Sequence, residues 1–262
     1  MGESNIQGDF ATRRFFFVHI MKTGGTTFLH QLFRNFAPDE VYPNNALDCP
    51  KDRLWQHLQV AYLLGLSEER RRRIRAYTGH FPYVVCELLD LDLVTLTVLR
   101  DPIDRTVSLL HQLRRDAPRH KDAALEDIYE DEVVFPRLIQ NHQTKIFSIT
   151  ASDGVKTFRD EVEIDADRLL LAKRNLAQVD VIGVTEQYDE FLDQLEHRFG
   201  WRFDRDLRAN ETAGAPDATP ALRRRIADDN QLDVDLYDYA RDLMKARSTA
   251  GDATHGQPAE AD

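Results

Sequence analysis

Residues 14–36 read RFFFVHIMKTGGTTFLHQLFRNF, and this stretch decides the fold. It opens with Arg14 to Ile20, an aromatic and β-branched run typical of a buried strand. From Thr26 to Phe36 the apolar side chains recur at helical spacing, which predicts a helix. A short loop that holds a lysine, two glycines and threonines lies between the two. The stretch therefore predicts a strand, a tight loop and a helix in direct succession.

The loop itself is Lys22-Thr23-Gly24-Gly25-Thr26-Thr27. Glycines let the backbone turn tightly and approach a ligand with no Cβ in the way. Main-chain N–H groups at the start of a helix attract anions, and the threonine hydroxyls and the lysine ammonium are further donors. An ordinary glycine turn is the alternative, but the combination favours a site for phosphate or sulfate. The P-loop of nucleotidases has its lysine after the glycines, whereas Lys22 precedes them, which disfavours an ordinary ATPase or kinase loop.

Strands and helices alternate along the rest of the chain. Leu93 to Leu99 reads as a strand that ends before a helix starting at Pro102, and Val179 to Val184 reads as a strand before a helix over Glu186 to Phe199. Further helices are expected after the N-cap residues Ser67 and Thr219 and over Val234 to Met244. This order predicts an α/β fold with a P-loop-like parallel sheet flanked by helices on both faces, in a single domain with a helical elaboration.

The composition fits one such domain. The 262 residues include 14 Phe and are 42% hydrophobic, which is enough for a core. Residues 1–12 are expected to be a flexible start, 13–247 the folded domain, and 248–262 a disordered tail without large apolar side chains. The net charge of −11, from 34 basic and 45 acidic residues, argues against a nucleic-acid partner, which requires a basic face.

The cysteines and the apolar runs bear on the cellular location of the chain. Cys49 and Cys86 are far apart and in no metal-ligand spacing, which fits a reducing environment without a disulfide framework. No apolar run has the length of a membrane span or the form of a signal peptide. A cytoplasmic location is therefore expected.

A second candidate site lies where Leu99 ends its strand and Arg100-Asp101-Pro102 begins a helix. The planar guanidinium of Arg100 suits a pair of phosphate oxygens, and Ser108 lies one to two turns into the helix. The alternative is a helix-capping ion pair between Asp101 or Asp104 and a neighbouring arginine. From the residues alone, phosphate binding and an ion pair at the helix cap are equally well supported.

A candidate base follows the short apolar stretch Ala76-Tyr77-Thr78. Gly79-His80 comes directly after it, so His80 is expected at a strand end. Histidine suits proton abstraction because its pKa lies near neutral pH. A structural hydrogen bond in a loop is the alternative role.

Together these motifs resemble those of the carbohydrate sulfotransferases, and the branch they most resemble is the bacterial relatives of heparan sulfate 2-O-sulfotransferase. The resemblance covers roughly residues 14–245 and is strongest in the first half of the chain. It rests on His19 to Thr27, on Leu99 to Ser108 and on Gly79-His80. The family often has proline where this chain has Met21, a change that affects no charged group.

The resemblance implies a function and a set of roles. The donor would be 3′-phosphoadenosine 5′-phosphosulfate (PAPS), and the acceptor a hydroxyl on a glycan or glycolipid, with no metal. His80 would be the catalytic base, and Lys22 would contact the 5′-phosphate and the bridging oxygen. The remaining donor contacts would come from Thr23, Gly24, Gly25, Thr26 and Thr27 around the phosphosulfate and from Arg100 and Ser108 at the 3′-phosphate.

Two other functions stay open at this point. A nucleotide-dependent kinase or other phosphoryl transferase with a divergent phosphate loop would need Mg²⁺, with Asp101 as its metal-binding acid. A non-catalytic protein with a decayed site would bind the donor without turnover.

Several polar residues remain without a firm role. His19 is expected to be packed in its strand, and His111 could face the donor or the solvent. His142, within Asn141-His142-Gln143-Thr144, is a reserve candidate for acceptor contact. The arginine runs Arg70 to Arg73 and Arg223 to Arg225 read as solvated helix faces, with glycan binding as the alternative. In relatives, a loop such as the one that Asn210-Glu211-Thr212 starts often covers the donor.

Overall fold

The computed structural model describes residues 12–48, 59–154, 156–207 and 218–255. Within these ranges the chain forms a five-stranded sheet in the order β2-β3-β1-β4-β5, and every neighbouring pair is parallel. The strands are β1 (Arg14–Val18), β2 (Val41–Tyr42), β3 (Ala76–Tyr77), β4 (Leu93–Leu99) and β5 (Val181–Val184). The central strand β1 pairs Phe15 with Ala76 on one side and with Val94 on the other. The predicted parallel α/β sheet is confirmed.

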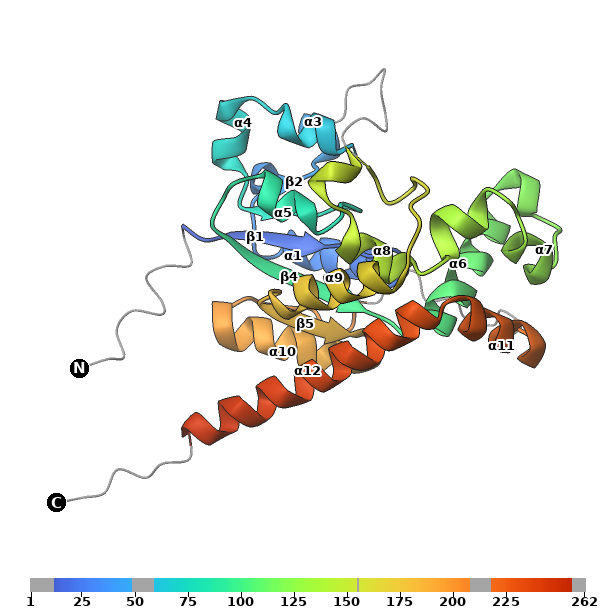
Figure 1. Ribbon diagram of the computed structural model, residues 1–262. Helices are drawn as coiled ribbons and strands as arrows, with labels where there is room; N and C mark the ends of the chain where they lie inside the picture. Colours follow the sequence, from blue (N-terminus) through green and yellow to red (C-terminus); the bar gives the residue numbers. More distant parts are fainter. Residues whose placement is uncertain (1–11, 49–58, 155, 208–217, 256–262) are drawn as a thin grey trace.

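Alternate residues of β1 feed two different cores, because successive side chains of a strand point to opposite faces. Phe15 and Phe17 pack with α1 (Gly25–Leu32) and α10 (Tyr188–Phe199). Phe16 and Val18 belong to the other core, to which α8 (His142–Ser148), α9 (Ala166–Ala177) and α12 (Gln231–His255) contribute. Helices therefore cover both faces of the sheet, as predicted (Figure 1).

Three helices form the helical elaboration at one end of the molecule (Figure 1). They are α6 (Pro102–Asp116), α7 (Leu125–Tyr129) and α11 (Pro220–Asp229). Their apolar side chains make a third core that includes Leu110, Ile128 and Ile226. Since α6 starts directly after β4, this end of the molecule adjoins the carboxyl edge of the sheet.

Shorter elements complete the described chain. The helices are α2 (Asn45–Asp48), α3 (Val60–Leu64), α4 (Glu68–Arg73) and α5 (Val84–Leu88). The 3₁₀ turns are η1 (Pro38–Glu40), η3 (Pro118–His120), η5 (Ala151–Asp153) and η6 (Thr185–Gln187), and η4 (Phe135–Ile139) is a π-helical turn. Ser67 and Thr219 cap α4 and α11 as expected, since their hydroxyls accept from the N–H groups of Arg70 and Leu222.

Some boundaries differ from the prediction. Helix α1 ends at Leu32 and not at Phe36, because the N–H groups of Arg34 and Asn35 bond to the carbonyls three residues before them, those of Gln31 and Leu32, which tightens the last turn. Helix α12 runs to His255, past residue 247, where the folded domain was expected to end, because an established helix extends residue by residue at little cost. Residues 256–262 and 1–11 lie outside the described ranges.

Within those ranges, no helix has both the length and the apolar character needed to cross a bilayer.

Candidate active site

The loop between β1 and α1 has an unusual backbone. Gly24 (φ +84°) and Lys22 (φ +70°) both adopt left-handed conformations, which cost a residue with a Cβ about 1 kcal/mol or more. Gly25 is needed for a different reason, because a Cβ there would lie 1.9 Å from His19 Nε2. The two glycines therefore have different roles: Gly24 permits the left-handed turn, and Gly25 leaves room for the His19 ring.

The start of α1 is suited to an anion. Gly24 is the N-cap and offers no side-chain hydrogen bond, and none of the residues in the first turn is acidic. The first N–H groups of a helix have no partner within the helix and carry partial positive charge. Thr26 is exposed at this end, while Thr27 is buried.

The Thr23 hydroxyl does not face a ligand, which corrects the expectation of three threonine hydroxyls around the anion. Thr23 is buried, and its Oγ1 donates to the Ile20 carbonyl at 3.0 Å. This hydrogen bond shapes the loop from inside, so Thr23 can reach a ligand only through its main chain.

Three cationic side chains converge on the loop. Arg100 Nη1 donates to the Lys22 carbonyl at 3.3 Å, which joins the two motifs that the sequence singled out. The pKa of Lys22 is lowered, first by burial and then by the charges of Arg115 and Arg100. Asp116, which pairs with Arg115, offsets part of this repulsion. An anion bound here would relieve the remaining repulsion, even though the whole chain is acidic.

Arg115 was missed by the sequence analysis. It lies seven residues after Ser108 on α6, and residues with this spacing share one face of a helix. Ser108, which is half-buried, therefore lies on the same face of α6 as Arg115, whose charge acts on Lys22.

His80 lies just past β3 with one ring nitrogen engaged. Its Nδ1 is 2.9 Å from the His19 carbonyl oxygen. A carbonyl only accepts, so Nδ1 carries the proton and Nε2 of the neutral ring carries the lone pair. Burial lowers the pKa of His80 to about 4, against a partial opposing effect of this hydrogen bond. His80 is therefore neutral near pH 7 and can accept a proton on Nε2.

His19 connects the base to the loop. Its ring lies against Gly25 on one side, and its centroid is 4.1 Å from that of His80 on the other. Burial lowers the pKa of His19 as well, so the pair is uncharged. The ring of His19 is packed as expected, although the residue follows the last residue of β1, and it lies between the anion loop and the candidate base.

The segment around Phe158 forms the far side of this histidine pair. The Phe158 ring lies 4.9 Å from that of His80, and the Arg159 guanidinium lies 5.3 Å from the Phe158 ring centre. Arg159 is exposed, and its charge contributes to the lowered pKa of His80. Neither residue was singled out from the sequence, because the loop that holds them has no periodic pattern.

Two more histidines that the sequence singled out, His142 and His111, are buried. His142 is completely buried, with its ring 6.5 Å from Phe158, so it is not exposed at the surface as a residue for acceptor contact would be. His111 is nearly buried, and Arg114 Nη2 lies 3.2 Å from its Nδ1. Arg105 is fully buried and donates to the carbonyls of Leu138 and Ile139.

The arginine runs are engaged in ion pairs. Arg70 bonds to Asp48, whose carboxylate is almost fully buried. Other members of these runs pair in the same way: Arg72 with Glu68, Arg73 with Asp39, Arg223 with Asp104 and Arg225 with Glu130. The structural interpretation of both runs is favoured over glycan binding. The loop at 210–212 lies outside the described residues.

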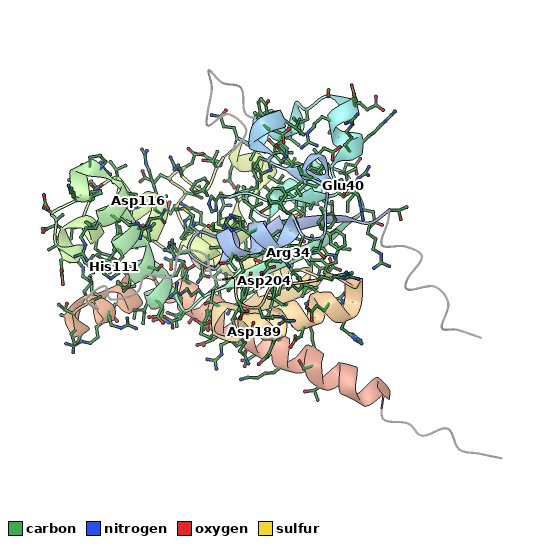
Figure 2. All side chains as sticks on the ribbon, turned by 180° about the vertical axis from the view of Figure 1, so that it is seen from behind. Arg34, Glu40, His111, Asp116, Asp189 and Asp204 are labelled. Carbon is green, nitrogen blue, oxygen red and sulfur yellow. The ribbon has the colours of Figure 1, made fainter. Side chains whose placement is uncertain are left out.

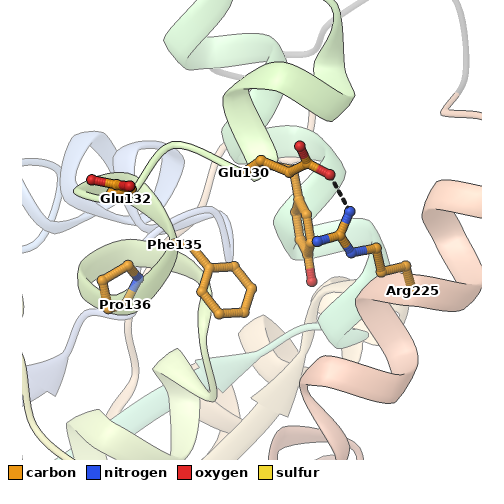
Figure 3. A pocket seen from close by; sticks show the side chains of 6 residues that line it. Glu130, Glu132, Phe135, Pro136 and Arg225 are labelled. Atoms are coloured by element: carbon orange, nitrogen blue, oxygen red, sulfur yellow. Dashed lines mark hydrogen bonds and ion pairs between the residues drawn. The ribbon is translucent and has the colours of Figure 1, made fainter.

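A hollow on the helical end is separate from the anion loop and from His80 (Figure 3). It is lined by Tyr129, Glu130, Glu132, Phe135, Pro136 and Arg225. None of them belongs to the anion loop, to the start of α6 or to β3. No cluster of three or more His, Cys, Asp or Glu side chains in the described ranges could hold a metal ion.

Comparison with known proteins points to sulfotransferases. The chain is 26% identical to heparan-sulfate 6-O-sulfotransferase 2 of Danio rerio and 28% identical to heparan-sulfate 6-O-sulfotransferase 1 of Homo sapiens, each over 88% of this chain. It spans 58% and 65% of their lengths. A sulfotransferase structure from Alicyclobacillus acidocaldarius aligns with a TM-score of 0.45 at 15% identity over 86% of this chain and 94% of that one. No family model matches the chain.

These relatives agree with the resemblance at the level of heparan sulfate sulfotransferases. The motifs indicated the 2-O branch, whereas the relatives described here carry 6-O names.

Proposed function

We propose that this chain transfers a sulfuryl group from PAPS to a hydroxyl group of a carbohydrate. The observation that carries the proposal is the hydrogen bond from Arg100 to the Lys22 carbonyl. It joins two anion-binding motifs beside a neutral histidine whose Nε2 can accept a proton. This combination serves group transfer to an alcohol, which requires both a held anionic donor and a base.

The residues present fit the donor. The uncapped start of α1 and the Lys22 ammonium suit the phosphosulfate, and the Arg100 guanidinium suits a second phosphate. Ser108 would join Arg100 at the 3′-phosphate. The residues proposed around the phosphosulfate are Lys22, Thr23 through its main chain, Gly24, Gly25, Thr26 and Thr27.

The chemistry is a direct in-line transfer. When bound, PAPS supplies the sulfuryl group and a phosphate leaving group. His80 Nε2 takes the proton of the acceptor hydroxyl while its oxygen bonds to sulfur and the bond from sulfur to the bridging oxygen breaks. Lys22 and the α1 N–H groups stabilise the charge that this bridging oxygen gains. The step balances without a metal.

The acceptor is proposed to be a glycan of the heparan sulfate type, because the relatives that support it are named for that polymer. Their names favour the 6-hydroxyl, and the motifs of this chain favour the 2-hydroxyl. The cytoplasmic location stays a prediction.

The test is a transfer assay with ³⁵S-labelled PAPS and chemically desulfated heparan sulfate. We expect Lys22→Ala to lower kcat about 10²–10³-fold, as the loss of a donor to a developing anion does. We expect His80→Asn to lower it about 10²–10⁴-fold, as the loss of a general base does. Lys173→Ala and His197→Asn are matched controls on α9 and α10 and should keep the full rate.

Disaccharide analysis of the product then locates the label at O2 or O6. A Lys22→Ala protein with the full rate of transfer would overturn the proposed mechanism.

A further inference from the structure

We infer that Gln143 is a positioning residue for the donor, because its side chain clamps the main chain of Arg100. The inference rests on the proposed function, in which Arg100 binds the 3′-phosphate. Gln143 has no contact with the loop of β1 and α1 in the hydrogen bonds described, so it acts through Arg100.

The clamp consists of two hydrogen bonds. Gln143 Nε2 donates to the Arg100 carbonyl at 2.8 Å, and the Arg100 N–H donates to Gln143 Oε1 at 3.1 Å. Arg100 lies one residue past the end of β4, where a neighbouring strand no longer pairs with it. One buried amide therefore replaces a strand partner and fixes the backbone from which the guanidinium reaches the Lys22 carbonyl.

Gln143 is itself held from α12. Asp233 Oδ2 accepts from the Gln143 N–H at 3.0 Å, and Asp233 Oδ1 accepts from the Thr144 N–H at 2.7 Å and from its hydroxyl at 2.8 Å. The Asn141 side chain accepts from the Asp233 N–H in return. Gln143, Thr144 and Asp233 are each no more than 1% exposed. Since every member of the network is buried, Gln143 has little freedom to move away from Arg100.

The arrangement predicts a specific defect when the clamp is lost. The Arg100 main-chain groups would lose two partners, and the guanidinium would lose its fixed origin. Because a small misplacement of a binding group weakens binding strongly, affinity for a 3′-phosphate should fall. The groups that take part in the transfer step stay in place, so kcat at saturating PAPS should change little.

A matched control exists in the same chain. Gln31 is also fully buried, and it clamps Asp204 in the same way, with Nε2 to the carbonyl at 2.6 Å and the Asp204 N–H to Oε1 at 2.9 Å. Figure 2 shows Asp204 near Arg34, well apart from His111 and Asp116 of α6. Gln31→Met thus removes the same kind of clamp, but at a place distant from Arg115 and Asp116, whose charges act on Lys22.

The experiment measures the Kd of adenosine 3′,5′-bisphosphate by titration calorimetry, with thermal unfolding in parallel. We expect Gln143→Met to raise Kd and the KM for PAPS at least about tenfold, whereas Gln31→Met leaves both within about twofold at a comparable loss of thermal stability. Gln143→Glu adds a pH readout, because only a protonated carboxyl can both donate to and accept from Arg100. Its Kd, relative to wild type, should improve between about pH 8 and about pH 5.5.

The outcomes separate the two claims. A wild-type protein that does not bind the bisphosphate overturns the proposed function. Two other results overturn the positioning role alone. One is that folded Gln143→Met binds the bisphosphate as tightly as wild type, and the other is that Gln143→Met and Gln31→Met lose the same amount of affinity. If Gln143→Met does not fold, Gln143→Glu decides, and a Kd ratio that is independent of pH contradicts the inference.

Discussion

His80 owes its readiness as a base to one hydrogen bond and to its burial. The His19 carbonyl holds the proton on Nδ1, and burial keeps the ring uncharged, with a pKa of about 4 in place of 6.5. A low pKa makes His80 a weaker base, but it also means that the imidazole is unprotonated in nearly every molecule at neutral pH. In the proposed reaction this arrangement presents Nε2 to the acceptor hydroxyl without competition from solvent protons.

The pH dependence of the reaction follows from this. We expect the acid limb of kcat/KM for the acceptor to fall with an apparent pKa near 4, because this parameter reports the free enzyme. Initial rates between about pH 3.5 and pH 8 measure it. An acid limb near 6.5 would show a His80 that is exposed to solvent in the active protein.

The same shift has a defined sign for stability. The unfolded chain binds a proton on His80 more readily than the folded chain, so the free energy of unfolding falls as the pH drops from about 6.5 to about 4.

Individual residues show how far sequence reasoning reaches. Lys22, Arg100 and His80 could be named because each follows a recognisable strand in a motif. Gln143 and Arg115 could not, because their importance comes from contacts with residues far away in the sequence, such as Arg100 and Lys22. The inward turn of the Thr23 hydroxyl depends on local backbone geometry that composition does not express.

The start of α6 is the element that presents Arg100 and Ser108. Asp101 is its N-cap, with Oδ1 accepting from the N–H groups of Ile103 at 2.9 Å and Asp104 at 3.0 Å. Pro102 occupies the first helical position, where its missing N–H costs nothing. The carboxylate of Asp101 is thus already engaged in fixing the helix.

Substitution of Asp101 distinguishes a cap from a metal ligand. We expect Asp101→Ala to lower the free energy of unfolding by about 1 kcal/mol, and Asp101→Asn to keep most of the stability because asparagine caps equally well. Sulfuryl transfer by Asp101→Asn should stay within a few-fold of wild type. Denaturant unfolding and the transfer assay measure both effects. Loss of sulfuryl transfer in a stable Asp101→Asn protein would contradict a role of this carboxylate that is confined to capping the helix.

The bounds of a strand were predicted best where the strand is long. The bounds of β4 were predicted correctly, because an apolar run of seven residues ends at a charged residue and a proline. Strand β2 has only two residues and was not predicted, since so short a strand has no measurable alternation. The order of the strands was also beyond the sequence, because pairing depends on contacts between distant segments.

The whole molecule places a cationic centre in an acidic chain. The sheet brings the carboxyl ends of β1, β3 and β4 to one edge, and the helical end carrying α6 adjoins that edge (Figure 1). The packing of α11 against α6 in the third core was not predicted, since these helices lie far apart in sequence. The layers of the fold therefore follow from the sequence pattern, whereas the enclosure of the site depends on tertiary contacts.

The most direct test of the account is thermal unfolding with adenosine 3′,5′-bisphosphate, with ATP and Mg²⁺ in parallel. A ligand that binds only the folded chain raises the midpoint temperature of unfolding. At a ligand concentration one hundred times Kd, it adds about 2.7 kcal/mol to the free energy of unfolding. We predict a clear rise with the bisphosphate alone, and a smaller rise in Lys22→Ala, which loses one of several contacts to the ligand. A rise with ATP and Mg²⁺ but none with the bisphosphate would contradict the assignment of the loop to a sulfuryl donor.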